Sequence, residues 1–327
     1  MYMKKMFMTV LLALVCWQGG AWAATDTPDT LVVAKDGSGN FTTLWDALED
    51  VRAFMDYHKV ILVKKGVYRE KVVVPSWLTN VEILGEDRDQ TVITYDDHAN
   101  LYLPDGKNKM GTFRSYTMRV DANDITLKNL TIENASGRKG QAVALHTEGD
   151  RLKVINCRLL GNQDTVYTGL AGTRIYFKDC YIEGTTDFIF GPSVAWFEGC
   201  HIHSLVNSYV TAASTPKAYK YGYVFNRCKL TAAEGVDKVY LGRPWRPYGA
   251  TLFMNCELGK HITPAGWFNW GKVSNEQTAR YAEYNNTGEG ANTEARVAWS
   301  RQLSKKEASK VTPAVVFGFN DTWNVEE

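Results

Sequence analysis

Short runs of alternating apolar and polar residues recur along the chain from about residue 60 onward. The runs are rich in β-branched and aromatic residues and are separated by Gly, Asn and Asp, which is the pattern of β-strands bounded by turns. Examples are found at residues 60–63, 72–74, 81–84, 125–127, 154–155 and 175–177. No helical periodicity alternates with these runs, and this argues against a sheet built from strand–helix–strand units.

A recurrent sequence motif, which we call the phrase, accompanies the runs: apolar residues, one or two polar residues, a cysteine, and soon another apolar residue. The cysteines of the phrase are Cys157, Cys180, Cys200, Cys228 and Cys256. They are separated by 23, 20, 28 and 28 residues, and Leu130 takes the cysteine position in an earlier copy. A strand-containing unit of this length, repeated with variable insertions, is typical of a solenoid. We therefore expect an all-β, single-domain, right-handed parallel β-helix with an inward-facing cysteine ladder.

The cysteine ladder has two interpretations. Free cysteine behaves as a small buried apolar residue, so the ladder would simply be part of the core. Alternatively, Cys180 and Cys200 form a disulfide, because adjacent turns place their Cα atoms within the usual range for a bridge and an exported protein meets an oxidising compartment. The sequence leaves both interpretations open.

Both ends of the repeat carry helical signals that would cap the solenoid. Residues 43–54 form a one-sided apolar stripe that follows a capping residue, Thr43. The residues of the stripe are Leu44, Leu48, Val51 and Phe54. A second capping signal at Ser304 to Glu307 predicts a short helical and loop cap at the other end. A solenoid needs such caps because its open ends would expose core and strand edges.

The first 24 residues are predicted to be a signal peptide. Lys4 and Lys5 form a basic start, residues 6–17 an apolar stretch too short to cross a bilayer comfortably, and residues 21–23 a small-x-small cleavage site. Lipoprotein anchoring through Cys16 is the alternative, which the bulky residue before it disfavours. Residues 25–327 then form one secreted or periplasmic domain.

Charge and hydropathy exclude several classes of function. The chain has 37 Lys and Arg against 36 Asp and Glu, with no basic tract, so it has no electrostatic footprint for nucleic acid or a membrane surface. No later segment is apolar for long enough to span a membrane, and capped coils favour a soluble monomer. Aromatic residues make up 12% of the chain, so exposed rings could stack on sugars.

Three polar residues share the period of the repeat. Gln141, Asp164 and Asp187 follow one another at intervals of 23 residues, so stacked turns would align them on one face. Two carboxylates one turn apart do not readily ionise together, so one pKa should rise. A protonated acid beside an ionised partner suits acid–base catalysis with a carboxylate nucleophile. The alternative is a purely structural ladder in which these side chains cap turns.

Two features favour the catalytic interpretation. Asp187 begins the apolar segment 187–191, where a carboxylate is costly without a partner. Arg243 stands 13 residues before Cys256, just as Asp187 stands 13 before Cys200, so Arg243 should lie about two turns along the same face. A charge-assisted bond from this arginine would hold Asp187 ionised and oriented.

Five segments of the chain, in order, resemble the signature segments of the pectin methylesterase family. They are residues 66–70, 141–145, 163–166, 187–191 and 241–245. The similarity extends over roughly residues 30 to 325, and the chain resembles a secreted bacterial member. The resemblance implies a carboxylic ester hydrolase that removes methyl groups from the C6 esters of methylated polygalacturonate (pectin) and releases methanol.

The resemblance also implies a role for each polar residue. Asp187 would be the nucleophile that forms an acyl-enzyme, and Asp164 the general acid and then base. Gln141 and Gln163 would donate hydrogen bonds to the oxyanion, while Arg243 would orient Asp187. Substrate-binding side chains are implied at Thr112, Tyr167, Phe190, Trp245 and Trp267. The family reading implies neither a metal nor another cofactor, and the chain has no Gly-x-Ser-x-Gly elbow.

Rival interpretations fit the residues less well. His201 and His203 could ligate a metal from one strand, but a third ligand is not near in sequence. Residues 36–40 are glycine-rich but lack the lysine of a phosphate-binding loop. A pectate lyase would need calcium-binding acids, and a polygalacturonase several clustered acids. A non-catalytic pectin-binding β-helix would have no use for a costly carboxylate paired with arginine.

Overall fold

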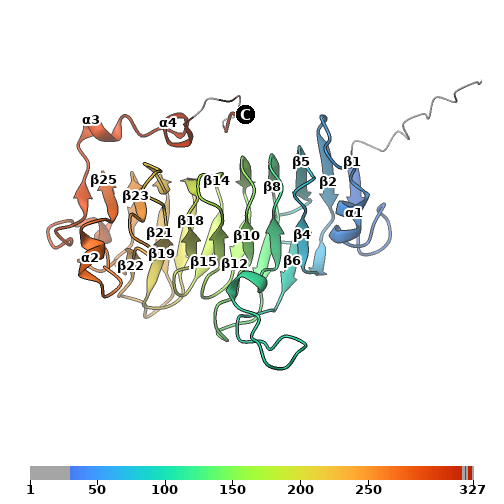
Figure 1. The fold of residues 1–327 in the computed structure, drawn as a ribbon, viewed down its shortest axis with the longest axis horizontal. Coiled ribbons are helices and arrows are strands. Elements are labelled where there is room, and N and C mark those ends of the chain that lie inside the picture. Colours follow the sequence, from blue (N-terminus) through green and yellow to red (C-terminus); the bar gives the residue numbers. More distant parts are fainter. Residues whose placement is uncertain (1–29, 319–320, 322, 326–327) are drawn as a thin grey trace, which may run out of the picture.

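The computed structural model describes residues 30–318, 321 and 323–325, and over these residues the chain is a parallel β-helix (Figure 1). Its strands form three parallel sheets, which we call A, B and C, with eleven, eight and seven strands. Each turn of the coil contributes a strand to each sheet in the order A, B, C over most of the length. The prediction of an all-β solenoid is confirmed.

The strands of sheet A are β1 (Thr30–Val33), β2 (Lys59–Val63), β5 (Val81–Gly85), β8 (Ile125–Lys128), β11 (Leu152–Ile155), β14 (Arg174–Lys178), β17 (Val194–Glu198), β20 (Tyr223–Asn226), β23 (Ala250–Met254), β25 (Arg280–Tyr284) and β26 (Arg301–Gln302). Sheet B comprises β3 (Gly66–Arg69), β6 (Thr91–Tyr95), β9 (Thr131–Asn134), β12 (Arg158–Leu160), β15 (Tyr181–Gly184), β18 (His201–Ser204), β21 (Lys229–Ala232) and β24 (Glu257–Leu258). Sheet C comprises β4 (Val72–Val74), β7 (Met118–Val120), β10 (Leu145–Thr147), β13 (Val166–Thr168), β16 (Ile189–Gly191), β19 (Tyr209–Ala213) and β22 (Tyr240–Gly242).

The residue before each repeat cysteine turns the chain from sheet A into sheet B. This position has a φ between 47° and 60° in six successive copies. The residues are Asn129, Asn156, Asp179, Gly199, Arg227 and Asn255. Asn, Asp and Gly tolerate left-handed backbone best, and one of these three occupies this position in every copy except the one with Arg227.

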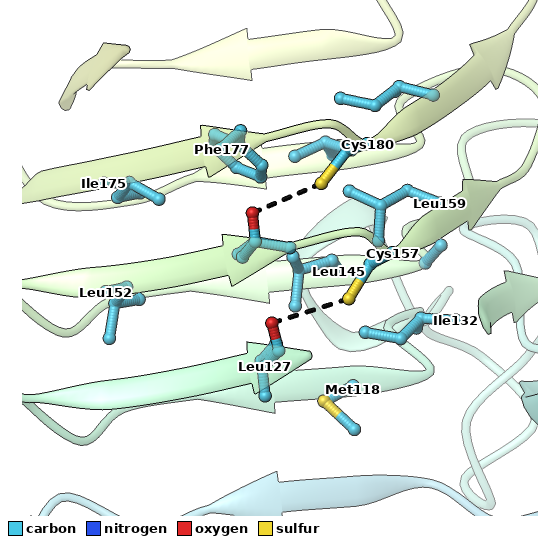
Figure 2. Close-up of a cluster of buried hydrophobic side chains, with 14 of the residues drawn as sticks. Met118, Leu127, Ile132, Leu145, Leu152, Cys157, Leu159, Ile175, Phe177 and Cys180 are labelled. Carbon is cyan, nitrogen blue, oxygen red and sulfur yellow. Dashed lines mark hydrogen bonds between the residues drawn. The ribbon is translucent and has the colours of Figure 1, made fainter. Parts of the chain in front are cut away.

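The five cysteines of the ladder are buried and free, and Figure 2 shows two of them, Cys157 and Cys180, among the apolar side chains inside the coil. The Sγ atom of Cys180 donates to the carbonyl oxygen of Val154 at 3.2 Å, one turn below. The interpretation as small core residues is therefore confirmed, and the alternative disulfide between Cys180 and Cys200 is wrong. Beside the ladder four phenylalanines stack with ring centroids 4.3 to 4.5 Å apart: Phe177, Phe197, Phe225 and Phe253.

The N-terminal cap is α1 (Leu44–Asp50), shorter than the predicted helix. The hydroxyl of Thr43 accepts a hydrogen bond from the backbone N–H of Asp46, as expected. Leu44 and Leu48 are buried against the first turns, but Phe54 lies beyond the helix with positive φ and is 81% exposed. Its assignment to the apolar stripe was wrong because the helix ends at Asp50, with Val51 as its C-cap, before the periodicity reaches Phe54.

The C-terminal residues fold back along the outside of the coil. We call residues 303–318, 321 and 323–325 the strap; it contains α3 (Lys305–Ala308), with the predicted capping box at Ser304, and α4 (Pro313–Phe317). Figure 1 shows the strap running back over sheet A. Val311, Val316 and Phe317 pack against outward side chains of that sheet. At the far end of the strap, Asp321 Oδ2 lies 2.7 Å from Arg174 Nη2 of β14.

The other helices are short: α2 (Val273–Glu276), and the 3-10 helices η1 (Thr112–Arg114) and η2 (Glu289–Ala291). Within the described part of the chain, none of the helices is long and apolar enough to cross a membrane.

Candidate active site

Two buried aspartates lie side by side where the chain enters sheet C. Asp164 precedes β13 and Asp187 precedes β16, and the pairing of Val166 with Ile189 puts the two aspartates in register. Both have positive φ, 68° and 50°, so the same turn is repeated on successive coils. Their exposed fractions are 8% and 6%, so little water reaches either carboxyl group.

Arg243 reaches Asp187 from two coils away, in the residues that follow β22. Its Nε donates to Asp187 Oδ1 at 2.9 Å and its Nη2 to Asp187 Oδ2 at 2.7 Å. This paired geometry fixes the carboxylate plane and supplies a positive charge. The predicted contact is confirmed, although strand register places Arg243 level with Phe190, three residues beyond Asp187. The long side chain covers that offset.

The environments of the two carboxyl groups differ. Burial raises the pKa of Asp164 well above its ordinary value, and the neighbouring Asp187 charge raises it further. Burial also raises the pKa of Asp187, but the hydrogen bonds and charge of Arg243 oppose that rise. The pKa of Asp164 is therefore raised further than that of Asp187, the ordering that acid–base work by a carboxylate pair requires.

Two aromatic rings that the sequence interpretation missed enclose the guanidinium group. The Arg243 Cζ atom lies 3.8 Å from the ring centroids of both Tyr209 and Trp270. Tyr209 also stacks on Tyr240, with centroids 5.4 Å apart. Because a planar guanidinium gains from aromatic faces on both sides, this sandwich restricts Arg243 to the orientation that meets Asp187.

Strand register places Gln141, but not Gln163, differently from the prediction. Leu145 pairs with Val166, so the step between these coils is 21 residues and Asp164 lies level with Val143. Gln141 thus lies two residues before the position level with Asp164. The prediction that Gln141, Asp164 and Asp187 align on successive turns is therefore wrong for Gln141. Gln163 directly precedes Asp164 in the chain. Both glutamines are half-buried, and no other described residue holds their side-chain amides by a hydrogen bond.

Aromatic side chains line up beside the acids on the outer face of sheet C. Tyr167 contacts Phe190 at a centroid distance of 4.9 Å, and Phe190 contacts Trp245 at 5.8 Å. Phe190 is only 4% exposed, so it mainly supports the other two rings. Phe113 of η1, which the sequence interpretation also missed, is exposed and lies 4.9 Å from the Tyr167 ring. Thr112 precedes it in η1 and is half-buried.

Trp267 does not join this surface. It is 1% exposed, packs against Phe253 and Tyr281 in the core, and donates from Nε1 to Glu283 at 3.3 Å. The interpretation of Trp267 as a substrate-binding residue is therefore corrected. The ring three residues later, Trp270, faces Arg243 instead, because the chain turns through positive φ at that residue.

The histidine pair lies elsewhere, on sheet B. Hydrogen bonds join Thr231 Oγ1 to His201 Nε2 at 2.6 Å and to His203 Nδ1 at 2.7 Å. Among the residues that the structure describes, no three His, Cys, Asp or Glu side chains converge as a metal site. The pair is thus held by a threonine hydroxyl.

Fold and site together define a class, the parallel β-helix proteins with an arginine-paired carboxylate and a second acid on one outer face. The pectinesterase family model matches residues 30–319. Pectinesterase 31 of Arabidopsis thaliana is 38% identical over 281 residues, which cover 84% of this chain and 88% of that protein. The chain therefore belongs to the pectinesterase family. It spans about half the length of other relatives, such as a probable pectinesterase/pectinesterase inhibitor of Brassica napus (36% identical, 91% of this chain, 52% of that protein).

Solved structures agree with this assignment. A pectin methylesterase from carrot has a TM-score of 0.82 and 34% identity, covering 90% of this chain and 95% of that one. An alanine mutant of a pectin methylesterase, in complex with a hexasaccharide, has a TM-score of 0.77 and 29% identity, covering 90% and 98%. The expectation of a bacterial protein is not borne out, because these curated relatives are plant proteins.

Proposed function

We propose that this chain hydrolyses the methyl esters of pectin with Asp187 as the nucleophile and Asp164 as the general acid and base. The reaction class follows from membership of the pectinesterase family. The observation that carries the residue roles is the paired Arg243–Asp187 contact beside a second carboxyl group whose pKa is raised by burial.

The first half-reaction uses both acids. An Asp187 oxygen attacks the C6 carbonyl carbon, and the carbonyl electron pair moves onto its oxygen. Gln141 and Gln163 have unengaged amides and would donate to this oxyanion. As the tetrahedral centre collapses, the bond to the methoxy oxygen breaks and Asp164 supplies the proton that makes methanol. The product is an anhydride between Asp187 and the galacturonate.

The second half-reaction reverses the role of Asp164. Now ionised beside the neutral anhydride, it takes a proton from water as the water oxygen attacks the C6 carbon. Collapse of the second tetrahedral centre breaks the bond to Asp187, releases the galacturonic acid, which then loses its proton to solvent, and restores Asp187 as a carboxylate held by Arg243. The proton that left with methanol is thereby replaced, so the site returns to its starting charge.

The outer aromatic side chains would bind the polymer. Tyr167, Trp245 and exposed Phe113 present rings beside the acids, and sugar rings stack on such flat faces. Thr112 would contribute a hydroxyl from η1. Phe190, Tyr209 and Trp270 would act mainly by positioning other side chains.

Export and oligomeric state complete the proposal. Residues 1–29 lie outside the described residues, so cleavage before residue 25 is proposed from the basic, apolar and small-residue pattern alone. Intact-mass measurement of exported protein tests it, since a lipid on Cys16 would add a diagnostic mass. We also propose that the mature chain is a monomer, which light scattering tests.

The function is tested by methanol release from highly methylated pectin, with the ultraviolet absorbance of unsaturated uronates followed in parallel. Methanol without rising absorbance, lost in Asp187→Ala, is the expected result. Absorbance growth with chain cleavage would instead establish a lyase, and binding without methanol would establish a binding module.

A further inference from the structure

The outward side chains of sheet A become smaller toward the C-terminal end of the coil. One outward column of this sheet runs in register through five strands, and its side chains shrink before it ends in an arginine. The column is Trp196, Val224, Leu252, Ala282 and Arg301. At Trp196 an indole ring fills the space beneath the strap, whereas at Ala282 the side chain is a single methyl group.

The neighbouring column also has small side chains and also ends in an arginine. Thr251 pairs with Tyr223 and Ala250 with Arg280, which places Gly222, Ala250 and Arg280 in one line. Gly222 has no room for a side chain, because a Cβ atom there would lie 2.1 Å from the hydroxyl oxygen of Thr215. The fold therefore maintains a low apolar floor, and each of its two columns ends in a guanidinium group.

The strap covers this apolar floor but does not fill the space above it. Leu303 hydrogen-bonds through its N–H to the Glu283 carbonyl at 2.9 Å, and Val311 packs into the apolar cluster of the strap. Between strap and sheet a cavity of about 500 Å³ remains, lined by the two columns from Gly222 and Val224 onward, by Tyr221 and by Glu307 of α3. A cavity between about 300 and 1,000 Å³ is the usual size for a small-molecule site.

The rim of the cavity is cationic. Its charged side chains are Lys220, Arg280, Arg301, Lys310 and Glu307. Arg301 is paired with Glu307 at 2.6 Å. Arg280 instead donates to backbone carbonyls, including Tyr248 O at 2.6 Å, and the described residues give it no carboxylate partner. The cavity therefore combines an apolar floor with uncompensated positive charge.

We infer that this cavity under the strap binds an anionic amphiphile, a small molecule with an apolar body and one carboxylate or sulfonate. The apolar body would lie on Ala250, Leu252 and Ala282, and the anion would face the rim cations, which attract it electrostatically. The site lies on sheet A, whereas the acids of the proposed active site lie on sheet C. Occupancy would tie the strap to the coil.

The test uses 1-anilinonaphthalene-8-sulfonate, with N-phenyl-1-naphthylamine as the neutral probe of the same apolar shape. The folded wild-type protein should bind the sulfonate at one saturable site, more tightly than the neutral probe and less tightly as salt rises. Ala282→Trp, which places in the cavity the residue found at Trp196 in the same column, should abolish binding. Methanol release from pectin should not change, which separates this inference from the proposed function.

A charge variant keeps the test decisive should Ala282→Trp fold poorly. Lys310→Glu should weaken binding of the sulfonate by about threefold or more and leave the neutral probe unaffected. Lys107→Glu, an equivalent change in an exposed loop far from the strap, is the matched control. Equal affinity for both probes, binding that survives Ala282→Trp, or no saturable binding would each overturn the inference.

Discussion

Asp164 and Asp187 occupy the same position on successive coils, yet only Asp187 is held by an arginine. Their following strands pair Val166 with Ile189, and both aspartates adopt left-handed backbone. The repeat thus supplies two similar carboxyl groups, and one cation from two coils away makes them unequal. Chemical asymmetry arises here from a contact beyond the nearest neighbour in an otherwise repetitive structure.

Replacing Asp187 by Asn should remove turnover while leaving the fold intact. The amide keeps the shape of the carboxyl group but cannot attack an ester, so kcat for methanol release should fall by about 10⁴-fold or more. Affinity for methylated pectin should remain within a few-fold of wild type. Near-normal turnover in this variant would contradict the nucleophile assignment.

Replacing Asp164 by Asn should change the pH dependence of stability. Burial raises the pKa of Asp164 in the folded state, so the folded protein holds this proton more tightly than the unfolded chain does. Its contribution to stability is therefore greatest below about pH 4, the ordinary carboxyl range, and declines as pH rises through the folded pKa. Asn cannot lose a proton, so the Tm of the variant relative to wild type should increase over that window.

Thermal unfolding of both proteins across the acidic to neutral range measures this difference. A gap in Tm that does not change with pH would mean that Asp164 does not carry the raised pKa. The same variant should lose most methanol release at every pH, because the first half-reaction needs the proton of Asp164 and the second needs its ionised carboxylate as a base.

Removing the ring of Trp270 should shift the pH–rate profile. Trp270→Leu frees one face of the Arg243 guanidinium, which weakens its hold on Asp187 and lets the pKa of that carboxyl group rise. The acidic limb of kcat/KM should then move to higher pH. Trp245→Leu is the matched control: its ring touches Phe190, so KM should rise without a shift of the limb. Identical profiles in the two variants would argue against the positioning role.

Truncating Gln163 should act on the transition state. Gln163→Ala should lower kcat by about 10²–10³-fold with little change in KM, because an oxyanion donor acts most strongly on charge that develops during reaction. Gln302→Ala, at an exposed position of sheet A, should have no effect. A rise in KM at constant kcat would instead assign Gln163 to substrate binding.

Reducing agents should not change stability. The five repeat cysteines are buried and free, so the Tm should be the same with and without dithiothreitol. Cys180→Ala should lower stability by about 1–2 kcal/mol through the small cavity that it leaves. A Tm that falls on reduction would show that two of these thiols are bridged.

The repeat could be predicted from sequence because every coil needs the same inward side chains and the same left-handed turn residue. That periodicity predicted the alignment of Asp164 with Asp187 and the contact of Arg243 with Asp187 from two coils away. It failed for Gln141, because the length of each turn outside the strands is free to vary and only strand pairing reveals a step of 21 residues.

Residues that act through tertiary contacts gave no periodic signal. Tyr209 and Trp270 meet Arg243 from separate elements, and nothing in their spacing indicates a shared partner. Trp267 and Trp270 lie three residues apart, so a motif could not show which ring is buried. The strap was recognised only as a capped helix, since its apolar residues face a surface assembled from several coils.

The strap also changes how the coil should come apart. In a solenoid each coil contacts only its neighbours, so coils can fray independently from either end. Here one segment joins β25, through Leu303 and Glu283, to β14, through Asp321 and Arg174. The coils between these points cannot open without releasing the strap, so they should melt as a single cooperative unit that includes the turns carrying Asp187 and Arg243.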